Sequence, residues 1–211
     1  MLKLYGQFRS RTFRVAWLCK ESAIPYEHVN VTIYGDDAQS KTPWFAALNP
    51  NARVPAIDDD GLVLWESAAI NLYLAEKYNS PLWPATPQGR GRMLQWAFFI
   101  ANDVETHMVT VMQHRVMFPP EKRNAQLADS SDAALQPKLK LLDEHLAKNK
   151  FFGSDPGGGG GTWDMADFMV ASVCYSFFAM KYDLAAFPHF QAWLMASIER
   201  PQAKEARKLR E

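Results

Sequence analysis

The first part of the chain alternates between strand-like and helix-like hydrophobic patterns. Leu2 to Tyr5 has the period of two that is typical of a strand, and Gly6 ends it. Apolar residues between 15 and 19 then recur at helical spacing, which predicts a helix that begins near Arg11. Alternation returns over Pro25 to Ile33, which predicts a second strand. The chain therefore opens with a strand, a helix and a strand.

The next segments extend this pattern. Residues 34–42 are polar and predict a loop, and Pro43 to Leu48 predicts a short helix with proline in its first turn. Two closely spaced apolar strands flank Asp58 to Gly61, and a helical pattern begins at Glu66-Ser67. A strand–helix–strand unit requires parallel strands, whereas the last two strands form an antiparallel hairpin. The order β-α-β-α-β-β-α indicates a thioredoxin-like α/β domain over residues 1–78.

The remainder of the chain predicts helices alone. Residues 79–89 contain three prolines without periodicity and predict a linker. We expect an all-α domain over residues 90–211, with helices over 90–117, 131–149, 165–181, 187–198 and 201–211. The glycine-rich segment Asp155 to Gly161 lacks the Lys-Ser/Thr that follows a phosphate-binding loop, so it predicts a surface connection.

Charge and composition narrow the classes of function. Lys plus Arg and Asp plus Glu both number 23, which gives no electrostatic reason to expect a nucleic-acid or anionic-membrane partner. No apolar run is long enough to span a bilayer, and the first residues lack a signal segment, so we expect a cytoplasmic protein. Cys19 and Cys174 form no metal-ligand pattern, which predicts buried reduced thiols and no metal site.

Two short stretches carry candidate chemistry. Val54-Pro55 places a residue without an N–H beside a strand, which leaves backbone groups free to bind something other than a neighbouring strand. Glu66-Ser67 places a carboxylate and a hydroxyl at a helix N-terminus. A third pattern, Asp164-Met-Ala-Asp167, has the spacing of a capping box and predicts a role in folding.

These stretches resemble the soluble glutathione transferases of bacterial, serine type, over nearly the whole chain. The similarity rests on Leu4 to Val15, with a serine four residues after the glycine, and on Leu48 to Ala56 followed by Glu66-Ser67. Met165-Ala-Asp167 is similar to the same family's capping-box aspartate. The resemblance implies a transferase that uses glutathione as co-substrate, needs no metal and forms a homodimer.

The resemblance also implies how the tripeptide is bound. Pro55 would follow a cis peptide bond, and the N–H and C=O of Val54 would pair with the cysteinyl backbone like an added strand. Ser67 and the helix N-terminus suit the glutamyl carboxylate, and Glu66 suits its ammonium. Lys41 and Arg53 are the candidates for the glycyl carboxylate, although Arg53 takes a position that the family usually gives to glutamine.

Catalysis in this family requires that glutathione be a thiolate. A free thiol has a pKa of about 8.5, and lowering it by roughly two units corresponds to about 2.7 kcal/mol. Ser10 would donate a hydrogen bond to the thiolate, with Arg11 or Arg14 adding positive charge; Tyr5 is the competing donor at the end of the same strand. No cysteine lies near position 10, which argues against the disulfide-exchange members.

The resemblance also suggests which residues contact the second substrate, an electrophile, and which alternative functions to consider. Five apolar residues are the candidates for contact with a small hydrophobic electrophile: Phe8, Met108, Met112, Tyr175 and Phe178. One alternative is a glutathione-dependent isomerase of the maleylacetoacetate isomerase type, and another is a non-catalytic binding or regulatory protein on the same fold.

Overall fold

The computed structural model describes residues 1–153 and 161–211. Residues 154–160, which include most of the glycine-rich segment Asp155 to Gly161, lie outside this description. The chain divides into two units, Met1–Trp83 together with Arg200–Glu211, and Pro84–Glu199. The expected second domain included the last helix, but that helix belongs to the first unit.

The first unit contains a four-stranded sheet. Its strands are β1 (Leu2–Tyr5), β2 (Glu27–Val29), β3 (Ala56–Asp59) and β4 (Leu62–Trp65). Their order is β2-β1-β3-β4, with β1 parallel to β2 and antiparallel to β3, and with β3 and β4 forming the hairpin. This topology confirms the predicted thioredoxin-like arrangement.

Strand β2 is shorter than the predicted stretch from Pro25 to Ile33. β1 ends at Tyr5, and Gly6 donates the last hydrogen bond of this edge to the carbonyl of Val29 (3.0 Å). Beyond that point Thr32 bonds instead to the turn that follows, accepting from the N–H of Ser40 (3.0 Å). The alternating pattern continues past the last residue that β1 can pair.

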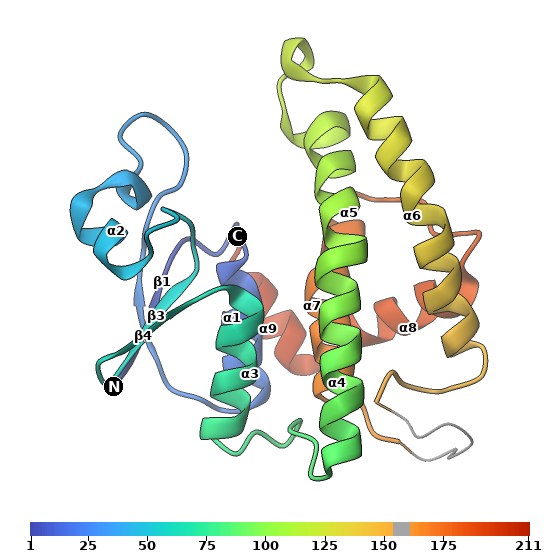
Figure 1. The fold of residues 1–211 in the computed structure, drawn as a ribbon, viewed down its shortest axis with the longest axis horizontal. Helices are drawn as coiled ribbons and strands as arrows, with labels where there is room; N and C mark the ends of the chain where they lie inside the picture. Colours follow the sequence, from blue (N-terminus) through green and yellow to red (C-terminus); the bar gives the residue numbers. More distant parts are fainter. Residues whose placement is uncertain (154–160) are drawn as a thin grey trace. The chain divides into compact units, whose positions relative to one another are not determined.

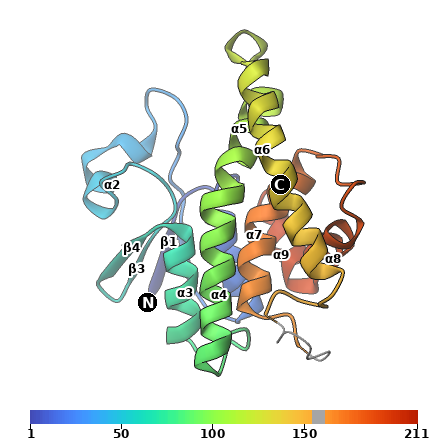
Figure 2. The same ribbon diagram turned by 45° about the vertical axis from the view of Figure 1, so that its right-hand side comes forward.

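Helices cover both faces of the sheet in the first unit. They are α1 (Thr12–Glu21), α2 (Pro43–Leu48), α3 (Ser67–Lys77) and α9 (Pro201–Lys208), with a 3-10 turn η1 (Gln39–Lys41) before α2. α1 and α3 lie on one side of the sheet and α2 lies on the other (Figure 1, Figure 2). Every residue of α1 from Thr12 to Cys19 is buried, because β1, α3 and α9 all pack against it.

An ion pair fixes α9 to the N-terminal unit. Arg200, just before α9, donates two hydrogen bonds to the carboxylate of Glu21 at the end of α1 (3.0 and 2.7 Å). Glu21 also accepts from the indole N–H of Trp17 (3.0 Å), so the buried carboxylate is well satisfied. The contact joins residues 179 positions apart, so the local helical pattern could not indicate it.

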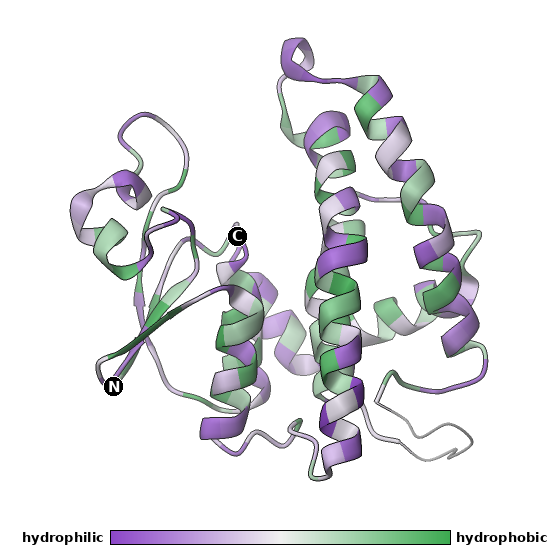
Figure 3. Ribbon diagram, in the orientation of Figure 1, coloured by the Kyte–Doolittle hydropathy of each residue, from purple (hydrophilic) through white to green (hydrophobic). Residues whose placement is uncertain are grey.

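The second unit is built from helices. They are α4 (Pro87–Phe99), η2 (Ile100–Val104), α5 (Glu105–Met112), η3 (Gln113–Met117), η4 (Pro120–Lys122), α6 (Ala125–Leu146), α7 (Met165–Ala179) and α8 (Pro188–Ile198). The predicted helix over 90–117 is therefore a continuous helical run with two π-helical turns. Figure 3 shows alternating hydrophilic and hydrophobic turns along it. α6 begins earlier than predicted because the side chain of Asn124 accepts from the N–H of Leu127 (2.9 Å) and caps it.

The predicted capping box is confirmed at the start of α7. Asp164 accepts from the N–H of Ala166 (2.8 Å), and Asp167 accepts from the N–H of Asp164 (3.4 Å). Asp167 also accepts from the N–H of Phe152 (3.1 Å) and from the indole N–H of Trp193 (2.9 Å). One buried carboxylate therefore joins α7 to α8 and to the segment before α7.

Two further expectations concern the thiols and the membrane. Cys19 and Cys174 are both buried and are not joined by a disulfide, as predicted. Within residues 1–153 and 161–211, no helix combines the length and the apolar composition needed to cross a membrane.

Candidate functional site

One end of the sheet brings the predicted site segments together. Tyr5 at the end of β1 pairs with Ala56 at the start of β3, and Ala56 pairs with Trp65 at the end of β4. The loop after β1, the Val54-Pro55 step before β3 and the Glu66-Ser67 step after β4 therefore meet at the same edge. The register of the hairpin explains why stretches separated in sequence form one candidate site.

At Gly6 the start of α1 and the side chain of Val54 approach the loop after β1 most closely. The φ of Gly6 is +135°, and a Cβ at this position would lie 2.2 Å from Oγ1 of Thr12 and 2.8 Å from Cβ of Val54. Only glycine tolerates both this backbone conformation and this approach. The first residue of α1 and the side chain of Val54 thus both lie where a side chain of residue 6 would stand.

Ser10 lies in the turn before α1 and is half-buried. Its hydroxyl donates to the carbonyl of Gln7 (2.6 Å) and accepts from the N–H of Thr12 (3.1 Å). The hydroxyl of Thr12 is 3.0 Å from the same oxygen. Ser10 is not the N-cap residue, which is Arg11, but it contacts the N-terminus of α1, where helix dipoles favour negative charge.

Val54 has the geometry of a backbone docking edge. The Val54–Pro55 peptide bond is cis, and the Val54 side chain is buried in a cluster with Tyr5, Val31 and Phe45. The preceding turn is fixed by Asn49, whose side chain donates to the carbonyl of Arg53 (2.6 Å). Among the described residues, neither the N–H nor the C=O of Val54 makes a hydrogen bond, so both can pair with an extended peptide.

Glu66 and Ser67 begin α3. Glu66 is exposed and has a φ of 72°, and Ser67 is the first residue of the helix with 5% of its surface exposed. Neither side chain has a hydrogen-bond or ion-pair partner in the described part of the chain. A carboxylate, a hydroxyl and the N–H groups of a helix start are therefore presented together, which suits a ligand that carries both an ammonium and a carboxylate.

Comparison with known proteins identifies this arrangement. Residues 1–76 match the model of the glutathione S-transferase N-terminal domain, and residues 106–201 match that of the C-terminal domain. Glutathione S-transferase GstB of Escherichia coli strain K12 is 30% identical over 210 residues, which are 97% of each chain. The chain belongs to the glutathione S-transferase family.

Solved structures of glutathione S-transferases share the fold over the whole chain. The theta-class enzyme of Xanthomonas axonopodis pv. citri with glutathione bound has a TM-score of 0.83 and 29% identity, covering 97% of this chain and 96% of that one. Glutathione S-transferase-I bound with lactoylglutathione has a TM-score of 0.85 and 27% identity, covering 99% of each chain. Because these relatives are named as transferases, neither the isomerase nor the non-catalytic alternative is favoured.

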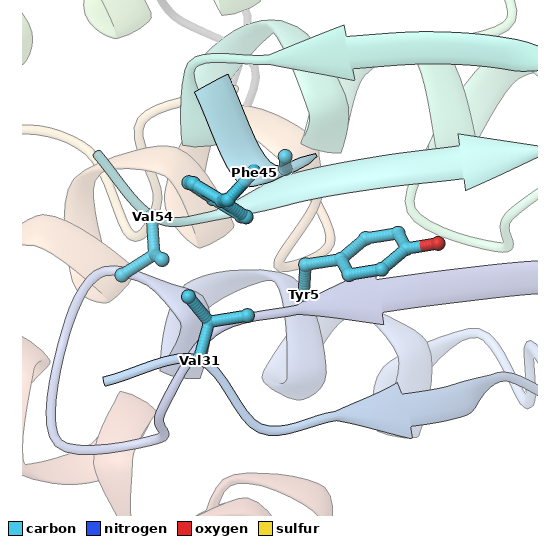
Figure 4. Packing of buried hydrophobic residues seen from close by; sticks show 5 residues of the cluster. Tyr5, Val31, Phe45 and Val54 are labelled. Carbon is cyan, nitrogen blue, oxygen red and sulfur yellow. The ribbon is translucent and has the colours of Figure 1, made fainter. Parts of the chain in front are cut away.

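Tyr5, the competing thiolate donor, lies in an apolar environment. Its ring packs with Val31, Phe45 and Val54, and its phenol oxygen points away from Val54 (Figure 4). The hydroxyl has no hydrogen-bond partner among the described residues, and burial raises its pKa above the ordinary value. Tyr5 thus packs beside Val54 with its hydroxyl directed away from it, and the choice between Ser10 and Tyr5 as thiolate donor stays a prediction.

The two candidate cations for the glycyl carboxylate differ in their surroundings. Lys41 is exposed and donates to the carbonyl of Gly35 (3.0 Å), within the loop that precedes α2. Arg53 is exposed, and its guanidinium has no partner among the described residues. Both are surface cations on the same unit as Val54, so their ligand role stays a prediction.

The candidates for electrophile contact fall in both units, and each is described within its own. Phe8 stacks on the ring of His28, with centroids 4.1 Å apart. Met108 is fully buried, Met112 and Tyr175 are half-buried, and Phe178 is 40% exposed. Tyr175 and Phe178 are neighbours on α7, with ring centroids 5.8 Å apart. Their role also stays a prediction.

Sequence reasoning missed three residues that fix the loop of Ser10. Thr12 contacts the Ser10 hydroxyl, His28 contacts the carbonyl of Gly6 through Nε2 (2.6 Å), and Arg210 donates to the carbonyl of Phe8 (3.3 Å). The carbonyl can only accept, so Nε2 of His28 carries the proton. A threonine beside a candidate serine was a usable signal, whereas nothing local indicated His28 or Arg210.

Proposed function

We propose that this protein binds glutathione as a thiolate and conjugates it to small hydrophobic electrophiles. The observation that supports this most directly is the convergence of Ser10, the start of α1 and the unpaired backbone of Val54 around Gly6. In this proposal, a tripeptide whose cysteinyl backbone pairs with Val54 directs its thiol toward Ser10, which Thr12 holds beside Gly6. The family membership gives the reaction class.

In this proposal the candidate site has a group for each charge of glutathione. The N–H and C=O of Val54 pair with the cysteinyl residue, Ser67 and the α3 N-terminus bind the glutamyl carboxylate, and Glu66 binds the ammonium. Lys41 and Arg53 supply positive charge for the glycyl carboxylate. We include Pro55 because it shapes the Val54 edge.

Activation requires a rotation of the Ser10 hydroxyl. Its one proton points to Gln7 or Thr12 in the structure, and it turns to the sulfur when glutathione binds. The thiol proton leaves to solvent, and the thiolate is stabilised by Ser10 and the α1 N-terminus. The sulfur lone pair then forms the C–S bond. A halide departs with its bonding electrons, or, in an addition, the displaced pair is protonated from water.

We also propose that the protein is a homodimer. The edge strand β4 exposes Leu62, Val63 and Trp65, and α4 exposes Leu94 and Phe98, so large apolar side chains are available on both units. A second copy of the chain is the occupant we propose. Analytical ultracentrifugation of the wild type and of Trp65→Glu tests this, and a wild type that sediments as a monomer would refute it.

A cytoplasmic location and a role in detoxification complete the proposal. Both rest on the family membership and on two buried cysteines that are not joined by a disulfide, which suits a reducing compartment. Conjugation of broad electrophile panels is the measurement that addresses detoxification.

The decisive experiment compares Ser10→Ala with Tyr5→Phe after titration calorimetry has established glutathione binding. The thiolate of bound glutathione is followed by its ultraviolet absorbance as a function of pH. We expect Ser10→Ala to raise the thiol pKa by about one to two units while Tyr5→Phe leaves it unchanged. Absence of glutathione binding would refute the function, and loss of thiolate only in Tyr5→Phe would refute the donor assignment.

A further inference from the structure

Thr12 directs two polar groups at one atom. It is the first residue of α1 and is 0% exposed. Its backbone N–H donates to Oγ of Ser10 (3.1 Å), and its own Oγ1 is 3.0 Å from that oxygen. Among the described residues, Ser10 is the hydrogen-bond partner of the Thr12 hydroxyl. A buried hydroxyl is costly without a partner, so this contact accounts for a threonine at this position.

The Ser10 hydroxyl has more acceptors than protons. It can donate to the carbonyl of Gln7 at 2.6 Å or to Oγ1 of Thr12 at 3.0 Å, but it has a single hydrogen. When that hydrogen turns to a thiolate, the acceptor that held it, the carbonyl of Gln7 or Oγ1 of Thr12, loses its donor. The carbonyl of Gln7 cannot donate in return, whereas the hydroxyl of Thr12 can rotate and donate to Oγ of Ser10.

We propose that Thr12 is a positioning residue whose hydroxyl donates to Oγ of Ser10 while Ser10 donates to the glutathione thiolate. In the thiolate state Oγ of Ser10 then accepts from both the N–H and the O–H of Thr12. Hydrogen bonds in such a chain polarise one another, so Ser10 becomes a stronger donor to sulfur. This inference rests on the proposed function and adds a second hydroxyl to its machinery.

The surroundings of Thr12 allow the idea to be tested without reshaping the site. Its Oγ1 lies against Gly6, and Gly6 lies against Val54, so the side chain is tightly packed. Valine has the same shape as threonine and lacks only the hydroxyl function, whereas serine keeps the hydroxyl and loses a methyl. Thr12→Val and Thr12→Ser are therefore a matched pair.

The experiment measures three quantities in the wild type, in both Thr12 variants, in Ser10→Ala and in the double variant Ser10→Ala with Thr12→Val. They are glutathione affinity by titration calorimetry, the thiol pKa of bound glutathione by ultraviolet absorbance, and the thermal unfolding midpoint. We expect Thr12→Val to reduce the thiolate fraction about 3- to 10-fold at a pH below the thiol pKa. Thr12→Ser should retain most of it, and Thr12→Val should add little once Ser10 is absent.

The outcomes separate this inference from the function beneath it. A wild type that shows no glutathione binding overturns the proposed function and this inference together. Binding with a thiol pKa unchanged in Thr12→Val overturns the inference alone. An equal effect of Thr12→Val in the presence and absence of Ser10 also overturns it, because the threonine would then act through the fold. Loss in Thr12→Val with recovery in Thr12→Ser supports it.

Discussion

The guanidinium of Arg9 donates to the carbonyl of Arg210 (2.8 Å), while the guanidinium of Arg210 donates to the carbonyl of Phe8 (3.3 Å). The two arginines thus fasten the segment after α9 to the loop that carries Ser10. Arg210 also lies over the ring of Phe13, 4.9 Å from its centroid. The position of the candidate thiolate donor therefore depends on residues about 200 positions away in the chain.

Arg210→Ala should lower both glutathione-conjugating activity and stability. The lost hydrogen bond is partly buried, and together with the cation–π contact it is worth about 1–2 kcal/mol of unfolding free energy. Loss of loop position should reduce kcat/KM by about 3- to 10-fold, because small displacements of reacting groups are costly. Steady-state kinetics and thermal unfolding check this.

Lys208→Ala is the matched control for Arg210→Ala. Lys208 pairs with Glu205 on the exposed side of α9, an i to i+3 contact that contributes little. Its kinetics should equal those of the wild type. Equal losses in both variants would mean that α9 affects activity only through general stability.

Local patterns predicted the elements that carry their own signals. The Asp164 and Asp167 capping box, the proline-initiated α2 and the hairpin turn at Asp60-Gly61 all depend on residues a few positions apart. Each is determined by backbone chemistry within one turn, so the sequence alone suffices. Asn124 is a similar local signal for the start of α6, but the apolar periodicity begins later in the chain and placed the predicted start too late.

Long-range contacts were beyond such patterns. Nothing near Glu21 indicates Arg200, and nothing near Gly6 indicates His28, because neither pairing leaves a periodic trace. For the candidate site, the segments with Ser10, Val54 and Ser67 were predicted from residue types and family resemblance. The convergence of those segments required the hairpin register, and the role of Thr12 required its distance to Ser10.

Gly6→Ala should disrupt the candidate site. A methyl group there would overlap Oγ1 of Thr12 and the side chain of Val54, and a φ of +135° disfavours any other residue. We expect a loss of at least about 2 kcal/mol of unfolding free energy and loss of glutathione binding. Gly61→Ala is the control, because that glycine has a φ of +94° with nothing within 4 Å. It should cost about 1–2 kcal/mol and leave glutathione affinity unchanged.

Two glycines in the helical unit should respond to alanine with opposite signs. A Cβ at Gly153 would lie 2.0 Å from the carboxylate of Asp164, so Gly153→Ala should displace the cap of α7 and cost about 1–3 kcal/mol. Gly91 lies inside α4 with nothing within 4 Å, so Gly91→Ala should stabilise by about 0.5–1 kcal/mol. Chemical denaturation measures both, and two changes of the same sign would contradict the packing at Gly153.

Asp59 should make the first unit sensitive to acid. Burial by itself would raise its pKa, but hydrogen bonds from Lys77 (2.6 Å), Tyr73 (2.9 Å) and Tyr78 (3.0 Å) outweigh burial and lower the pKa below the ordinary value. Its stabilising effect is thus present above pH about 4 and lost as the pH falls through the folded-state pKa. The difference in unfolding free energy between the wild type and Asp59→Asn should shrink from pH 6 to pH 2. A constant difference would exclude this linkage.

Asp167 should act in the opposite direction in the helical unit. Burial raises its pKa, the N–H of Phe152 lowers it in part and the charge of Asp164 raises it, with a resulting pKa of about 7. Because the folded-state pKa exceeds the unfolded value of about 4, the stabilising contribution is complete below pH 4 and is lost as the pH rises through 7. The unfolding free energy should therefore fall between these two pH values.

Asp167→Asn isolates this dependence because asparagine imitates the protonated carboxyl. Its amide oxygen can still accept from the N–H of Phe152 and from the indole of Trp193, and its NH₂ can face the carboxylate of Asp164. Denaturant titrations from pH 4 to pH 8 should show that the wild type loses stability relative to the variant as the pH rises. A difference that is independent of pH would show that Asp167 is ionised in the folded protein throughout this range, with its three N–H donors outweighing burial.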